Sequence, residues 1–424
     1  MKWALYNVLF AIVYPYLLPG FLSRMLRRGG YAARMGDRFA LYPERIVSAI
    51  KAGEGKFVWI HAVSVGEVQV AAQFMREWRK VEKDVRFCFS TTSSTGWRTA
   101  ERVIAEGDIL IYNPLDFPSF VKSALKLVKP RAVVLVESEI WPVFIRTARR
   151  YSVPVFLVNA RVSDRSAPRY RRARWFFKDV FSCFAAIFAQ SQMDRRRLVD
   201  AGAPEGRVHV TGSFKFDAAR RAAPEKEAEL RRWTGEGRIL LGGSTWPGED
   251  EVLIGAYAKL RVRDASLKLV IAPRHFEKAD AVEANIVKAG FRCVRRSRGE
   301  SPGRDANEVL LADTTGELMG FYGIADAVFV GKSLCAHGSQ NMIEPCLCAK
   351  PVLVGPYTEN FRPVMDELLA DGAVVQVNGT GEVAPKLEEM LFGGGGLGKR
   401  AAAAVESRRG AVAKCVERVR GVLG

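Results

Sequence analysis

The chain has 424 residues, of which 48% are hydrophobic and 26% are charged. This length exceeds what one hydrophobic core serves, so two domains of roughly 150–200 residues are expected, and the hydrophobic fraction excludes a disordered protein. A count of 64 basic against 46 acidic residues gives a net charge of +18, which predicts a polyanionic partner: nucleic acid, anionic membrane or a phosphorylated ligand. Seven cysteines without a Cys-x-x-Cys spacing and four histidines without ligand-like spacing predict a reduced protein without a zinc site.

The N-terminus carries an apolar run, residues 2–22 (KWALYNVLFAIVYPYLLPGFL), long enough to cross a membrane as a helix. Because basic residues accumulate on the cytoplasmic side of an anchor, the arginines that follow predict an N-terminal anchor over residues 1–22 with the body in the cytoplasm: Arg24, Arg27, Arg28, Arg34 and Arg38. Pro15 and Pro19 also fit a shorter interfacial helix, and a buried core helix is the third interpretation.

Apolar strands alternate with helices over residues 57–217, which predicts a parallel sheet covered on both faces. Each strand ends in polar residues, and ligands of such sheets bind at the carboxyl ends of the strands. The candidates at these ends are Glu67, Thr91–Thr95, Glu137, Glu139, Asn159, Arg161, Ser163 and Ser191. A second α/β domain over residues 218–424 begins its pattern at Arg238 and finishes with a basic helix over residues 401–423.

Residues 308–355 of the second domain read as strand 309–312, helix 317–324, strand 327–330, a glycine-rich turn, helix 342–348 and strand 351–354. Helix N-termini beyond the strand ends suit a phosphate. Glu317 and Glu344 stand in the first helical turns, where a carboxylate either caps its own helix or accepts hydrogen bonds from ribose hydroxyls. Arg274, at another strand end, is either a surface arginine or the positive charge for a leaving phosphate.

Glu67 follows a strand and a glycine at the start of a helix, in the sequence Ser64-Val65-Gly66-Glu67. Such a carboxylate serves either as a general base for a hydroxyl or as a first-turn residue that satisfies the helix dipole. The sequence contains no Walker A motif and no Asp-x-Asp. The arginine-rich stretch 161–174 fits nucleic acid, a membrane or phosphorylated lipid, or a solvated face, and the apolar N-terminus makes the lipid interpretation the most economical.

Nine stretches together resemble the Kdo transferases (3-deoxy-D-manno-octulosonic acid transferases) of Gram-negative lipopolysaccharide synthesis, over nearly the whole chain. They are HAVSVGEV (61–68), STTSSTGW (90–97), VESEIWP (136–142), NARVSDRS (159–166), TGSFKFD (211–217), GGSTWPGEDE (242–251), APRHFEK (272–278), DTTGELMGFYGIAD (313–326) and NMIEP (341–345). The chain departs from the family pattern at Gln340 and Trp246, where histidines are common, which puts a role for an imidazole there in doubt.

The resemblance implies an α/β GT-B fold of two Rossmann-like domains that face a cleft, with an N-terminal membrane-anchor helix. Residues 23–217 would bind the acceptor and residues 218–424 the donor. It also implies an inverting, metal-independent and cofactor-free transfer of Kdo from CMP-Kdo to a lipid A precursor at the inner membrane, with Glu67 as general base and no nucleic-acid partner. The implied CMP contacts are Pro273, Arg274, Thr315, Gly316, Glu317, Asn341, Met342, Ile343 and Glu344. The alternatives are another membrane-associated GT-B enzyme with a UDP-sugar donor, and a non-enzymatic binder of anionic lipid or nucleic acid.

Overall fold

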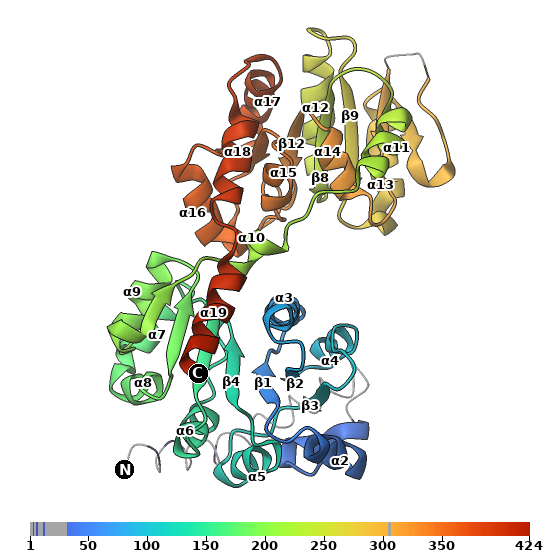
Figure 1. Ribbon diagram of the computed structural model, residues 1–424. Coiled ribbons are helices and arrows are strands. Elements are labelled where there is room, and N and C mark those ends of the chain that lie inside the picture. The colour runs from blue at the N-terminus through green and yellow to red at the C-terminus, as the bar shows by residue number, and fades with distance from the viewer. Residues whose placement is uncertain (1–2, 4–5, 7–11, 13–31, 304–306) are drawn as a thin grey trace. The chain divides into compact units, whose positions relative to one another are not determined.

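The computed structural model describes residues 3, 6, 12, 32–303 and 307–424, and these form two compact units (Figure 1). The first unit contains residues 1–214 and 410–424, and the second contains residues 215–409. Most of the anchor predicted over residues 1–22 lies outside the described residues, so the anchor stays a prediction. In the described part of the chain, no helix has the length and apolar character needed to cross a membrane.

The first unit is built on a parallel seven-stranded sheet with the order β3-β2-β1-β4-β5-β6-β7. Its strands are β1 Phe57–His61, β2 Arg86–Thr91, β3 Ile109–Tyr112, β4 Ala132–Val136, β5 Val155–Ala160, β6 Ala186–Ala189 and β7 Val208–Val210. The helices are η1 Ala32–Phe39, α2 Glu44–Ala52, α3 Val65–Val81, α4 Ser94–Ala100, α5 Pro118–Val128, α6 Pro142–Arg150, α7 Ala167–Arg172, α8 Arg174–Phe181, α9 Gln192–Asp200, η2 Glu205–Arg207 and α19 Ala411–Leu423. Strands β1 and β4 are buried at every position, as expected for a sheet covered on both faces.

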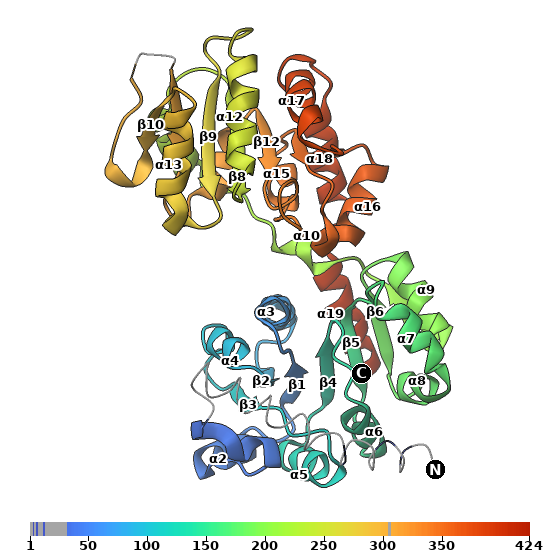
Figure 2. The same cartoon turned by 180° about the vertical axis from the view of Figure 1, so that it is seen from behind.

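The second unit repeats this plan with a parallel sheet in the order β10-β11-β9-β8-β12-β13-β14 (Figure 2). Its strands are β8 Ile239–Thr245, β9 Lys268–Pro273, β10 Arg292–Arg295, β11 Glu308–Leu311, β12 Ala327–Val330, β13 Val352–Val354 and β14 Val375–Gln376. A short helix, α10 Phe214–Ala218, leads into it. The remaining helices are α11 Pro224–Thr234, α12 Glu249–Leu260, η3 Phe276–Lys278, α13 Ala279–Lys288, η4 Arg296–Arg298, α14 Leu318–Ile324, α15 Ile343–Leu347, η5 Glu359–Phe361, α16 Arg362–Ala370, η6 Thr380–Glu382, α17 Val383–Phe392 and α18 Leu397–Glu406.

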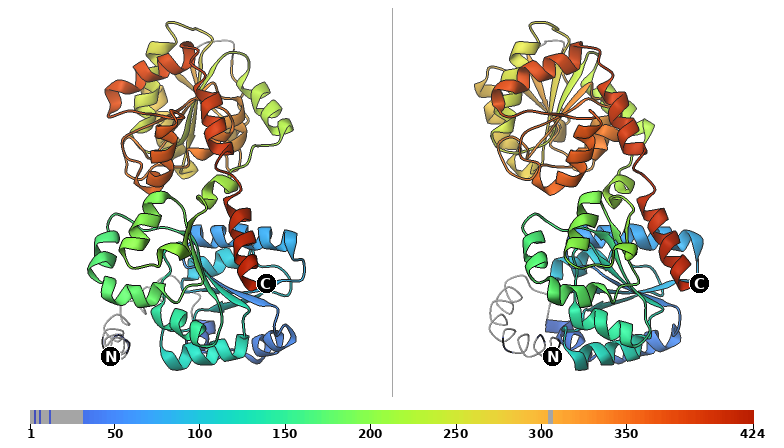
Figure 3. Two further views of the ribbon diagram at one scale, coloured as in Figure 1. Left: turned by 60° about the vertical axis from the view of Figure 1, so that its left-hand side comes forward. Right: turned by 90° about the vertical axis from the view of Figure 1, so that its left-hand side faces the viewer.

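Helices cover both faces of the second sheet (Figure 3). Apolar side chains of α12, α13 and α17 form one hydrophobic cluster with the sheet, and those of α11, α14, α15, α16 and α18 form the other. This layered arrangement confirms the predicted α/β class with parallel sheets.

The C-terminal helix differs from the prediction of one helix over 401–423 inside the second domain. Helix α18 ends at Glu406, and the chain then turns through Gly410, whose φ of 88° a residue with a Cβ rarely adopts. The following helix, α19, belongs to the first unit. The reason is apolar burial, because Cys415 and Val419 are fully buried in the hydrophobic cluster that α3 and the first sheet form.

Candidate active site

Both sheets have a switch point, where the chain reverses the direction in which it adds strands. In the second sheet the chain builds outward from β8 through β9 and then returns to place β12 on the other side of β8. In the first sheet β4 likewise pairs with β1 on the side away from β2. Loops that leave two neighbouring strands toward opposite faces open a crevice, and ligands of open α/β sheets bind there.

Five of the predicted donor residues line one hollow in the second unit, at the carboxyl ends of β8, β9 and β11. The hollow has a volume of about 150 Å³, and Pro273, Arg274, Thr315, Gly316 and Glu317 line it together with Ser244, Ala272, Phe276, Ala312, Thr314, Leu318 and Phe321. Residues 273–274 and 315–317 come from separate strand ends. The structure therefore brings these two segments together.

Arg274 lies at this hollow as a cation that no described residue pairs with. Its backbone amide donates to the Thr245 carbonyl at 3.0 Å, which fixes the residue beside the end of β8. Within the described residues its guanidinium forms neither a hydrogen bond nor an ion pair. A guanidinium without a carboxylate partner is suited to bind a phosphate.

Glu317 precedes α14 as its N-cap residue, and its side chain makes no capping hydrogen bond. Arg296 instead donates to it from Nε at 3.1 Å and from Nη2 at 2.9 Å, and Lys226 donates from Nζ at 2.6 Å. The Arg296 hydrogen bonds are the main cause of a pKa lowered to about 2, with Lys226 and Thr314 contributing against a smaller opposing effect of burial. Glu317 is thus held ionised at the edge of the hollow, and the capping interpretation is wrong.

The four predicted residues Asn341–Glu344 do not line this hollow. Asn341 Oδ1 accepts a hydrogen bond from the Ile343 amide at 3.0 Å and so supports the start of α15. Met342 and Ile343 are fully buried in the hydrophobic core. Because the core takes both side chains, only their backbone groups remain for a ligand. Burial raises the pKa of Glu344, opposed by its hydrogen bond with Asn341.

Glu249 organises the switch point of the second sheet, a role that the sequence did not reveal. Its fully buried carboxylate accepts hydrogen bonds from five backbone amides: those of Trp246 and Lys332 at 2.8 Å, Ser333 and Leu334 at 3.0 Å, and Cys335 at 3.5 Å. It therefore ties the turn after β8 to the loop after β12. The sequence shows only a glutamate in a first helical turn. Four of its hydrogen-bond partners lie more than 80 positions away in the chain, so its role could not be predicted from neighbouring residues.

Glu67 in the first unit forms a capping box at the start of α3. Its Oε2 accepts from the Val63 amide at 2.8 Å and from the Ser64 amide at 3.4 Å, while Ser64 Oγ accepts from the Glu67 amide at 3.2 Å. The capping interpretation is therefore confirmed. The other carboxylate oxygen, Oε1, accepts no hydrogen bond from the described residues, so the same side chain can cap through one oxygen and take a proton on the other.

The end of β4 places a second group of polar residues across the first switch point. Asn159 Nδ2 donates to Glu137 Oε1 at 3.2 Å. Trp141 Nε1 donates to Glu139 Oε2 at 2.8 Å, and His61 Nε2 lies 3.6 Å from the same oxygen. Burial raises the pKa of Glu139, but His61 and Trp141 lower it more, so that the net direction is downward. The predicted candidates thus fall into two sets, Glu137 with Asn159 and Glu139 with His61 and Trp141.

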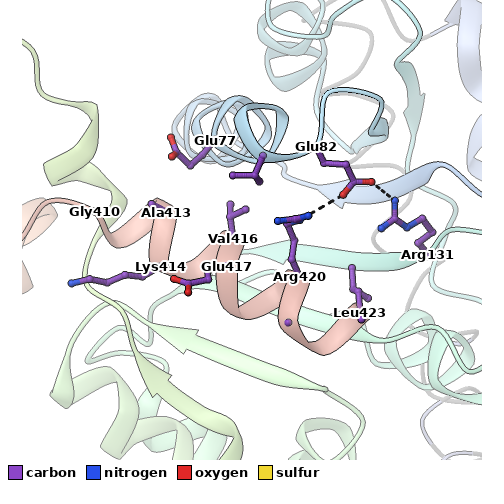
Figure 4. Close-up of a pocket in the computed structure, with 13 residues that line it drawn as sticks. Glu77, Glu82, Arg131, Gly410, Ala413, Lys414, Val416, Glu417, Arg420 and Leu423 are labelled. Atoms are coloured by element: carbon purple, nitrogen blue, oxygen red, sulfur yellow. Dashed lines mark hydrogen bonds and ion pairs between the residues drawn. The ribbon is translucent and has the colours of Figure 1, made fainter.

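A larger hollow of about 660 Å³ lies elsewhere in the first unit, between α3 and α19 (Figure 4). There Glu82 pairs with Arg131 at 2.5 Å and with Arg420 at 3.7 Å. Arg131 immediately precedes β4, so this hollow is at the amino ends of the strands, the edge opposite to the candidate sites. In the described part of the chain, no three His, Cys, Asp or Glu side chains are grouped so as to hold a metal ion.

Solved structures with the same architecture define the class of protein. A glycosyltransferase from Rickettsia africae ESF-5 is 14% identical, with 87% of this chain and 98% of that chain covered and a TM-score of 0.56. The UDP-GlcNAc 2-epimerase from Neisseria meningitidis bound to UDP-GlcNAc is 13% identical, with 84% of this chain and 100% of that chain covered and a TM-score of 0.53. The fold is therefore that of GT-B glycosyltransferases and their epimerase relatives.

Sequence relatives narrow this class to one family. Residues 33–218 match the family model described as 3-Deoxy-D-manno-octulosonic-acid transferase (kdotransferase). The 3-deoxy-D-manno-octulosonic acid transferase of Haemophilus influenzae is 30% identical over 391 residues, which cover 91% of this chain and 90% of the relative. Its counterpart in Bordetella pertussis is 35% identical over 335 residues, covering 75% and 76%. The chain belongs to the 3-deoxy-D-manno-octulosonic acid transferase family of glycosyltransferases, which confirms the predicted resemblance.

Proposed function

We propose that this enzyme transfers Kdo from CMP-Kdo to a lipid A precursor, lipid IVA, in lipopolysaccharide core biosynthesis, with inversion and without a metal or other cofactor. The observation that carries the proposal is the 30% identity to a named Kdo transferase over 91% of the chain. Because the relatives are named as Kdo transferases, the alternative UDP-sugar donor is not favoured. A competition assay between CMP-Kdo and UDP-sugars discriminates the two.

Glu67 acts as the general base in this reaction. Its Oε1 takes the proton of an acceptor hydroxyl while the hydroxyl oxygen attacks the anomeric carbon of Kdo. The bond from that carbon to the phosphate oxygen breaks, and CMP leaves with the electron pair. The new bond forms on the face opposite to the leaving group, which inverts the configuration. The Arg274 guanidinium, which no described residue pairs with, stabilises the negative charge of the departing phosphate.

The anionic lipid and the membrane are the proposed partners of the positive charge, in place of nucleic acid. The proposed location is the cytoplasmic side of the inner membrane, with residues 1–22 as the anchor. The apolar run, the arginines that follow it and the net charge of +18 support this location.

A single-turnover assay tests the reaction. The protein is mixed with CMP-Kdo generated in situ and lipid IVA in the presence of EDTA, and the product is identified by mass spectrometry. A gain of one or more Kdo masses is the expected result. CMP binding without any product would agree with the proposed donor site and would refute lipid IVA as the acceptor.

Substitution of Glu67 tests the base. In Glu67→Gln the amide oxygen still accepts the Val63 and Ser64 hydrogen bonds, so the capping box and the melting temperature are retained. The amide cannot accept the proton, and transfer is expected to fall by about 10²–10⁴-fold with CMP affinity within a few-fold of wild type. The control is Glu44→Gln, an exposed first-turn glutamate of α2, which should transfer normally. Normal turnover in Glu67→Gln would refute the assignment.

A further inference from the structure

The loop after β12 lies against the turn after β8 at the switch point of the second sheet. The Gly331 amide donates to the Gly243 carbonyl at 2.9 Å, and a Cβ at Gly331 would stand 2.2 Å from the Ser244 carbonyl oxygen. Only glycine permits this close approach. The backbone of the next residue, Lys332, therefore lies beside Ser244, which lines the same hollow as Arg274.

Lys332 occupies a backbone conformation that favours glycine. Its φ is 58°, in the left-handed region. The Glu249 carboxylate holds the Lys332 amide at 2.8 Å, and the Lys332 carbonyl accepts from the Ser339 amide at 2.7 Å. Glycine would satisfy both contacts without strain. A lysine at this position is therefore explained by a function of its side chain, because strained residues that are held by their surroundings cluster at binding sites.

The Lys332 ammonium is held over an aromatic ring. Nζ lies 4.7 Å from the centroid of the Trp246 ring, and this ring also contacts His275 at 5.4 Å. Within the described residues Nζ forms neither a hydrogen bond nor an ion pair. The nearby acid, Glu249, is occupied by backbone amides. The Trp246 ring thus fixes the position of a cation whose charge is not neutralised.

Two arginines at the end of β10 are, in contrast, neutralised. Arg295 pairs with Asp313 at 2.8 Å and Glu283 at 2.9 Å, and Arg296 pairs with Glu317. Arg274 and Lys332, at the ends of β9 and β12 on either side of β8, have no ion-pair partner among the described residues. Two unpaired cations that flank the strand at a switch point are the arrangement expected for an anionic ligand.

We propose that Lys332 is a donor-binding residue whose ammonium takes an anionic oxygen of the nucleotide-activated sugar, with Trp246 as the support for its side chain. The donor offers two such oxygens, on the nucleotide phosphate and on the sugar carboxylate. This inference rests on the proposed function for the identity of the donor.

The test measures the melting temperature and the donor affinity. Substitution of a purely structural lysine would change both in the same direction. In Lys332→Gly the left-handed strain disappears, so the melting temperature is expected to rise by about 2–4 °C. The same variant, and the neutral Lys332→Gln, are expected to bind the donor about 10- to 100-fold more weakly through loss of a charged hydrogen bond. Lys332→Arg, which keeps the charge, restores most of the affinity. Lys386→Gln, an exposed lysine of α17, is the control for loss of one positive charge.

Two probes identify the oxygen. Weaker calorimetric binding of CMP alone assigns Lys332 to the phosphate. Unchanged CMP binding with a raised KM for CMP-Kdo and an unaltered kcat assigns it to the carboxylate. If both quantities match those of the Lys386→Gln control, the proposal is overturned. Wild-type protein that binds CMP without transferring Kdo would refute the proposed function alone, and wild-type protein that binds no CMP would overturn both.

Discussion

Single carboxylates in this protein differ according to the groups that surround them. Among the described residues, Glu67 caps a helix with one oxygen and leaves the other without a partner, whereas Glu317 accepts from two cations and Glu249 accepts only from backbone amides. All three stand at the start of a helix after a strand. Position relative to a helix therefore does not separate a base from an ion-pair partner or a loop anchor. The hydrogen-bond donors around each carboxylate separate these roles.

Glu317 makes the stability of the second unit depend on pH. Its folded-state pKa of about 2 is below the ordinary value of 4.5, so ionised Glu317 stabilises the fold by about 2–3 kcal/mol at neutral pH. This contribution is fully present above pH 4.5 and is lost as the pH falls toward 2. Glu317→Gln is expected to lower the free energy of unfolding by a similar amount at pH 7, with a shrinking difference from wild type as the pH falls below 4.5.

Urea unfolding at pH 7 and pH 3.5 measures this difference. Glu388→Gln is the control, since Glu388 pairs with Arg263 on the surface, where both side chains are about half exposed. Such a pair contributes at most about 1 kcal/mol. A difference for Glu317→Gln that is equal at both pH values would show that its charge does not stabilise the fold.

At the scale of elements, the alternation of apolar runs predicted the strands well because a parallel sheet buries both faces of each strand. The run AVVLV, for example, is β4, with every residue buried. Strand ends also predicted that residues 273–274 and 315–317 lie close together, since they stand at the carboxyl ends of the neighbouring strands β9 and β11. The amphipathic pattern of residues 411–423 gives only the periodicity of a helix. Which sheet that helix covers depends on contacts with α3, distant in the sequence, and so it was assigned to the wrong unit.

The position of α19 yields a test at the level of the element. Val419 is fully buried against the first unit although it follows the second unit in the chain. Val419→Ala removes two methyl groups from that core and is expected to cost about 1–3 kcal/mol. Hydrogen exchange should then accelerate in β1 and α3 and stay unchanged in β8 and β12. Val422→Ala, on the same helix but with Val422 53% exposed, should change neither set. Faster exchange confined to the second unit would contradict the assignment of α19.

For the whole molecule, the net charge of +18 is not evenly distributed. Helix α7, which α8 follows directly, carries Arg169, Arg171 and Arg172, which are exposed and, within the described residues, form no ion pair. Trp175 of α8, beside these arginines, is 55% exposed. Phe176 of the same helix contacts the rings of Trp3 and Tyr6 at 5.4 and 5.3 Å. The arginine-rich surface therefore adjoins the start of the segment for which we predict an anchor, and arginine with exposed tryptophan is typical of a membrane interface.

Replacement of Arg169, Arg171 and Arg172 by glutamine tests whether this surface, and not net charge in general, binds the membrane. Each arginine near an anionic surface contributes about 1 kcal/mol, so the triple variant is expected to partition about 100-fold more weakly onto vesicles containing anionic lipid, in a sedimentation assay at near-physiological salt. Neutral vesicles should show little difference. The control removes the same charge from the second unit by Lys259→Gln, Lys288→Gln and Lys386→Gln, three exposed lysines. Equal losses in the two triple variants would mean that binding follows total charge, and an equal loss of affinity for duplex DNA would favour a general polyanion site over a lipid surface.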